Sequence, residues 1–128
     1  MSVRHAQFLI ASVFLLLGGW ALFAPGSVIE LAFTEEYREN GFLTRFVMAC
    51  FGAQAVLFGI MALCVKFTSK AFLTLAILLI PFFVFDWYFH FQMPVLNSIG
   101  MLDFVGNAVM FALCLYAWRR AKYEEQAA

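Results

Sequence analysis

The sequence predicts an all-α integral membrane protein with four transmembrane helices packed as an up-and-down bundle. Hydrophobic residues make up 65% of its 128 residues and charged residues 12%, whereas about 25% of a soluble domain is charged. Four apolar stretches approach the ~20 residues that a helix needs to cross a bilayer, at about 6–24, 42–65, 71–91 and 98–118. Their short connections favour antiparallel neighbours, so we expect a single domain over 1–128 without a soluble catalytic part.

The first expected span follows a short basic start, Arg4-His5. Its apolar stretch is long for a signal peptide, and Pro25 follows the only small-residue cleavage site, so we expect a retained helix. Pro25-Gly26 is expected to end this helix, because proline cannot continue the hydrogen-bond ladder and glycine tolerates a helix stop.

The connection 26–41 is the longest in the chain and the most acidic. Its first half, 28–33, is apolar enough to lie at the membrane interface. Thr34 precedes two glutamates, which is typical of a helix cap and an acidic first turn. We therefore expect a small interfacial lid. Its acidic residues are Glu30, Glu35, Glu36 and Glu39.

The second expected span carries a stripe of mostly small residues on one helical face. Small residues let helix backbones approach closely in lipid, so this face is expected to look into the bundle. The stripe consists of Arg45, Ala49, Gly52, Val56 and Gly59. Gln54 lies on the opposite face, and its amide needs a hydrogen-bond partner in lipid. We therefore expect Gln54 to contact another subunit.

The third and fourth expected spans each place two polar residues four positions apart, one above the other on one helical face. The pairs are Asp86 with His90, and Asp103 with Asn107. Pro81 lies near the middle of the third span and is expected to kink it. Aromatic residues around Asp86 are typical of an interfacial belt.

The basic residues predict the orientation, because cytoplasmic loops carry more lysine and arginine. Arg38 and Arg45 lie at one side of the expected bilayer. The other side has Arg4, Lys66, Lys70, Arg119, Arg120 and Lys122. Both termini are therefore expected in the cytoplasm and the lid outside. This topology gathers the polar residues in the outer half of the membrane: Glu30, Arg45, Asp86, His90, Asp103 and Asn107.

Three interpretations of this polar cluster stay open, because charged groups inside a bilayer need a partner or a function. In the first, Arg45 pairs with Asp86 or Asp103 and the cluster only ties helices together, leaving no empty pocket. In the second, the cluster binds a ligand or carries protons or a substrate. In the third, Asp86, His90, Asp103 and Glu30 hold a metal, although one histidine with scattered carboxylates is an unspecific pattern. We expect no metal.

The first half of the chain resembles small bacterial four-helix inner-membrane proteins of the DoxX-like and related uncharacterised families. The likeness rests on the segments Gly18 to Pro25, Phe42 to Arg45 and Gly52 to Gly59. It implies the architecture and a bacterial inner membrane, but it implies no activity and no site residue.

The expected function is that of a non-enzymatic subunit or accessory of a membrane assembly, either a homo-oligomer or a larger complex. The alternative is a small transporter or ligand-binding protein that uses the outer-half pocket. The formal net charge is zero and suggests no nucleic acid. Expected partners are membrane lipids and either a second copy or another membrane protein, with no cofactor.

Overall fold

The computed structural model describes residues 1–127, and 83% of the chain is helical, which confirms the predicted all-α class. Within that part, the only extended pairing is an isolated antiparallel bridge between Phe33 and Leu96. The helices are α1 (Val3–Phe23), α2 (Pro25–Ala32), the 3-10 helix η1 (Glu35–Tyr37), α3 (Phe42–Cys64), α4 (Ser69–Trp87), the π-helix η2 (Tyr88–Gln92) and α5 (Leu102–Ala127).

Local signals explain most helix ends. The Ser2 side chain accepts a hydrogen bond from the backbone N–H of His5 and caps α1. α1 ends at Phe23, and Pro25 then begins α2, where its missing N–H has no intrahelical partner to lose. The predicted acidic turn is η1, but the Thr34 side chain does not cap it. Its hydroxyl instead donates to the carbonyl of Pro94.

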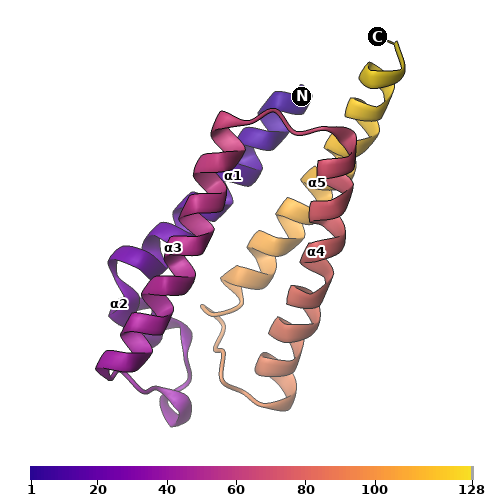
Figure 1. The fold of residues 1–128 in the computed structure, drawn as a ribbon. Coiled ribbons are helices and arrows are strands. Elements are labelled where there is room, and N and C mark those ends of the chain that lie inside the picture. Colours follow the sequence, from indigo (N-terminus) through magenta and orange to yellow (C-terminus); the bar gives the residue numbers. More distant parts are fainter. Residues whose placement is uncertain (128) are drawn as a thin grey trace.

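The long helices form two pairs that lie side by side (Figure 1). α1 packs on α3, α4 packs on α5, and the contact between α1 and α5 joins the pairs. Within the described residues, no Cα atom of α3 lies within 8 Å of a Cα atom of α4. Both chain ends lie at one end of the bundle, and α2 lies at the other (Figure 1).

Glycines set the close contact between α1 and α3. Gly52 and Gly59 are buried, as the small-residue stripe of the second span predicted. A Cβ atom added to Gly52 would lie 2.6 Å from the carbonyl oxygen of Gly18 and would also meet the backbone nitrogen of Leu22. Arg45 is the exception on this stripe, because it is exposed at the start of α3.

The largest apolar cluster lies between α1, α4 and α5, at the end that carries the chain termini. Its fully covered members include Ile10, Phe72 and Cys114. Gln7, 1% exposed, joins α1 to the end of α3 because its amide donates to the carbonyls of Ala62 and Val65. Asp86 and Asp103 lie toward the opposite end, where they line a cavity together with Val28 and Ala32 of α2.

Three helical stretches are long and apolar enough to cross a membrane, namely Val3–Phe23, Phe42–Cys64 and Ser69–Gln92. These stretches identify a helical membrane protein. The fourth expected span, at 98–118, is not among them, so the expectation of four such stretches is not met. The reason is polar content: α5 opens with Asp103 and Asn107 and continues through Arg119 and Arg120.

Candidate functional site

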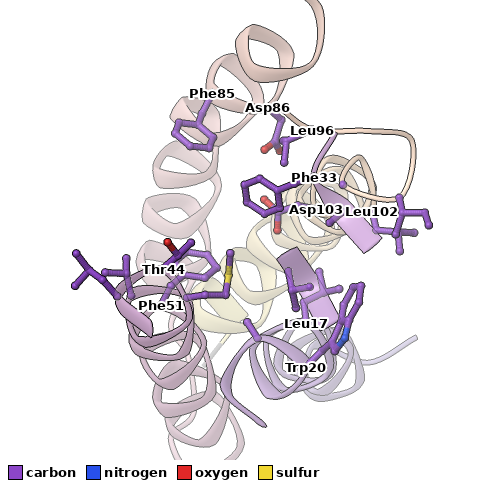
Figure 2. Close-up of a pocket in the computed structure, with 18 residues that line it drawn as sticks. Leu17, Trp20, Phe33, Thr44, Phe51, Phe85, Asp86, Leu96, Leu102 and Asp103 are labelled. Carbon is purple, nitrogen blue, oxygen red and sulfur yellow. The ribbon is translucent and has the colours of Figure 1, made fainter. Parts of the chain in front are cut away.

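A cavity of about 610 Å³ lies next to α2, between the two helix pairs. Most of its lining is apolar and comes from every long helix and from the connection after η2. Figure 2 shows side chains from α1, α3, α4 and α5 around the same space. The apolar walls include Leu17, Trp20, Val47, Phe51, Phe85 and Leu96.

Two carboxylates line this cavity, Asp86 from α4 and Asp103 from the first turn of α5. The side-chain amide of Asn107 lies between them and donates to both, at 3.3 Å from Asp86 Oδ2 and 3.1 Å from Asp103 Oδ2. Asp86 is 1% exposed and Asn107 4% exposed. The structure thus brings together three of the six polar residues that the sequence assigned to one cluster.

The chemistry of this carboxylate pair follows from its surroundings. Two like charges in an apolar site disfavour each other, and one amide group supplies both of the hydrogen bonds that hold them. The arrangement therefore favours a shared proton, a cation or a hydrogen-bond donor next to Asp86 and Asp103. Figure 2 shows both carboxylates at the same side of the cavity, near Phe33.

Arg45 and Glu30 belong to a different group, at the exposed surface. The Arg45 Nε donates to Asn40 Oδ1 at 2.6 Å, and the Asn40 amide donates to Glu30 Oε1 at 2.8 Å. The expected pairing of Arg45 with a buried aspartate is therefore wrong. The lid brings Asn40 over the start of α3, where it accepts the hydrogen bond that the aspartates were expected to accept.

His90 also lies apart from the carboxylates. Its Nδ1 is 2.8 Å from the carbonyl oxygen of Leu96, so this nitrogen carries the proton and donates. The chain winds as a π-helix from Tyr88, which turns less per residue than an α-helix. His90 does not line the cavity that Asp86 and Asp103 line.

The connection after η2 is hydrogen-bonded to α2 and to the residues that follow it, at the end of the cavity near α2, and the sequence did not predict this contact. The Asn97 amide donates to the carbonyl of Leu31 at 2.7 Å, and its Oδ1 accepts from the N–H groups of Ile99 and Gly100. The backbone N–H of Thr34 donates to Val95 at 2.9 Å. An asparagine that bonds the N–H two residues on is a recognised turn signal, and it could have indicated this role.

Gln54 is exposed on α3, about one turn beyond Phe51, and does not line the cavity. Large apolar side chains flank it, with Phe51 53% exposed and Leu57 58% exposed. Within residues 1–127, no three histidine, cysteine, aspartate or glutamate side chains converge as metal ligands. Asp86, His90, Asp103 and Glu30 are therefore not gathered in the arrangement that the metal interpretation needs.

No known protein family, curated protein or solved structure matches this chain. The resemblance to DoxX-like proteins stays a prediction.

Proposed function

We propose that this protein binds a hydrophobic small molecule in the cavity next to α2 and does so without catalysing a reaction. The cavity itself carries the proposal. Its volume of about 610 Å³ lies within the range of ligand pockets, roughly 300–1,000 Å³. A cluster that only ties helices together would leave no such space, and this favours the ligand-binding interpretation over the purely structural one.

The polar end of the cavity supports a preference among ligands. Asp86 and Asp103 accept hydrogen bonds, and the Asn107 amide is already used by both. A polar group that enters there gains most if it donates hydrogen bonds or carries positive charge. We therefore propose an apolar molecule with an amine or a comparable donor at one end.

The membrane arrangement is part of the same proposal. α5 packs against α4 and α1, and Asn107, Met110 and Cys114 are buried on it, so the Asn107 amide faces protein. We propose that α5 crosses the bilayer as a fourth span, with both termini in the cytoplasm and α2 at the outer face. The excess of basic residues at the end opposite α2 supports this orientation, and the proposed location is a bacterial inner membrane.

Trp20 offers a direct test because it lines the cavity. Replacing Trp87 and Trp118 by phenylalanine leaves it as the sole tryptophan of the chain. A brominated long-chain amine, titrated into protein in mild detergent, should quench Trp20 in a saturable manner. An unbrominated amine should reverse the quenching by competition, and a brominated alcohol of the same length should bind more weakly.

The matched variants for this test are Asp86→Asn and Glu30→Gln. Asp86→Asn should weaken binding of the amine more than binding of the alcohol. Glu30→Gln removes a carboxylate outside the cavity and should change neither. Quenching that never saturates, or that competitor does not reverse, would contradict the proposed function.

The exposed face of α3 favours a second candidate function, that of a subunit in a membrane assembly. Gln54 there carries an exposed amide among exposed apolar side chains, and such an amide gains from an interhelical hydrogen bond, worth roughly 0.6 kcal/mol on average. Native mass measurement of protein extracted in mild detergent tests this candidate. A larger species that Gln54→Leu dissociates would support it, and a monomer in both proteins would contradict it.

A further inference from the structure

We infer that the ligand reaches the cavity sideways from the lipid, through an opening between α3 and α4, and is therefore a lipid-like amphiphile of the bilayer. This inference rests on the proposed function, because it names the ligand class and the entry route of the same cavity. It depends on two separate features, an open side and a closed outer end.

The open side lies where the two helix pairs do not meet. Within the described residues, the Cα atoms of α3 and α4 all stay more than 8 Å apart. Side chains on both helices line the cavity and are also more than half exposed, which places them at the rim of an opening. They are Leu43 at 71%, Val47 at 58% and Phe51 at 53% on α3, and Phe85 at 55% on α4.

The outer end is closed by pairing between α2 and the connection that follows η2. Phe33 and Leu96 form the isolated antiparallel bridge, and both side chains line the cavity. The N–H of Asn97 donates to Ala32 at 3.0 Å, on the other side of the bridge from the Thr34 bond. A Cβ atom added to Gly100 would lie 2.5 Å from the carbonyl oxygen of Ala32, so the two segments are in direct contact.

The energetic consequence favours a ligand that is already in the membrane. A solute from the outer aqueous phase would have to break several backbone and side-chain hydrogen bonds, each worth about 0.5–1.5 kcal/mol. A molecule dissolved among the acyl chains meets only the apolar rim of Val47, Phe51 and Phe85. Its polar end would then lie against Asp86 and Asp103 near the outer interface, with its chain in the apolar part of the cavity.

The opening is tested by closing each route separately in the full chain reconstituted in liposomes. The background retains Trp20 alone and replaces the exposed Cys50 and Cys64 by serine. Phe33→Cys with Leu96→Cys forms a lid lock, because facing residues of a non-hydrogen-bonded pair have Cα atoms about 4.5 Å apart, within disulfide range. Val47→Cys with Phe85→Cys, bridged by bismaleimides of increasing length, forms a portal clamp.

The measurement is the rate of Trp20 quenching after mixing with vesicles that contain the brominated long-chain amine. We expect the oxidised lid lock to quench as fast as its own reduced form. The portal clamp should lose the fast quenching phase that the same protein shows before bridging. Each variant thus serves as its own control for changes in the cavity lining, and unchanged circular dichroism checks the fold.

Two results would overturn the inference. Slow quenching in the lid lock with unchanged quenching in the portal clamp would place the entry at the aqueous end. Efficient crosslinking of two copies through Val47→Cys alone, at the expense of quenching, would show that a second copy covers the opening. Absence of saturable quenching in the unbridged proteins is a different outcome, because it contradicts the proposed function itself.

Discussion

The contact between α1 and α3 predicts a large effect from one added methyl group, in the variant Gly52→Ala. The new Cβ atom would lie 2.6 Å from the Gly18 carbonyl oxygen, whereas ordinary contact begins at 3.4 Å, a shortfall of 3.4 − 2.6 = 0.8 Å. The opposing atoms belong to the backbone of α1, so no side chain is free to move aside. The two helices must separate, and every contact along their interface lengthens.

The magnitude follows from a matched variant. Gly19→Ala adds the same methyl group to the same kind of helix, but nothing lies within 4 Å of its Cβ position. Both variants gain about 1 kcal/mol of helix propensity, and this gain cancels in the comparison. The overpacking that remains costs about 1–3 kcal/mol. A gap of 0.5–1 Å also removes roughly a quarter to a half of the energy of each dispersion contact. We therefore expect a cost at the upper end of this range.

Equilibrium unfolding in mixed micelles of a mild detergent and dodecyl sulfate, followed by far-ultraviolet circular dichroism, measures this difference. Gly19→Ala should be at least as stable as the parent protein, and Gly52→Ala should unfold at a lower dodecyl sulfate fraction. Equal stability of the two variants would refute the reasoning, because it would mean that α1 and α3 are not in backbone contact at Gly52.

Three further predictions concern polar contacts. Gln7→Leu removes the donor to the Ala62 carbonyl and the acceptor of the Phe67 N–H, whereas the Val65 carbonyl keeps Arg4 as a donor. It should lower the free energy of unfolding by about 1–3 kcal/mol, measured in the same micelles. Asn107→Leu should destabilise similarly, and Asp86→Asn in the same chain should recover part of the loss because the new amide restores a donor. The Ser69 hydroxyl and N–H donate to Glu125 at 2.6 and 2.8 Å and hold the pKa of this carboxyl below its usual value. A carboxyl whose pKa is lowered in the folded state stabilises the fold at a pH above its usual pKa, and this stabilisation is lost as the pH falls through the lowered pKa. Acid should therefore reduce the thermal stability of Glu125→Gln less than that of the parent protein.

The sequence indicated the long helices and one of their interfaces correctly. Apolar length located the three spanning stretches, and the spacing of Gly52 and Gly59 predicted the buried face of α3. These inferences depend on helical periodicity, which persists over many residues and survives an error of one or two positions at a helix end. The fourth expected stretch is less apolar than the other three, because α5 begins only at Leu102 and carries Asp103 and Asn107 near its start.

The site was only partly predictable, since it depends on short irregular segments. Periodicity placed Asp86, Asp103 and Asn107 on facing stripes, and these three do meet. It failed for His90, because its ring instead donates to the carbonyl of Leu96 in the irregular connection after η2. It failed for Arg45, because the position of Asn40 is set by the path of the lid. Neither the path of that connection nor the path of the lid leaves a repeated pattern in the sequence.

The two faces of α3 explain why this small bundle has a cavity at all. Toward α1, glycines bring the backbones into contact, so α3 is held close to the first helix. Toward α4, the helix carries large side chains such as Val47 and Phe51, and the Cα atoms stay more than 8 Å apart. α4 is instead held by α5, whose Asn107 bonds the Asp86 carboxylate. The space between the pairs is therefore fixed by attachments on their other sides, and it stays open without any residue that props it apart.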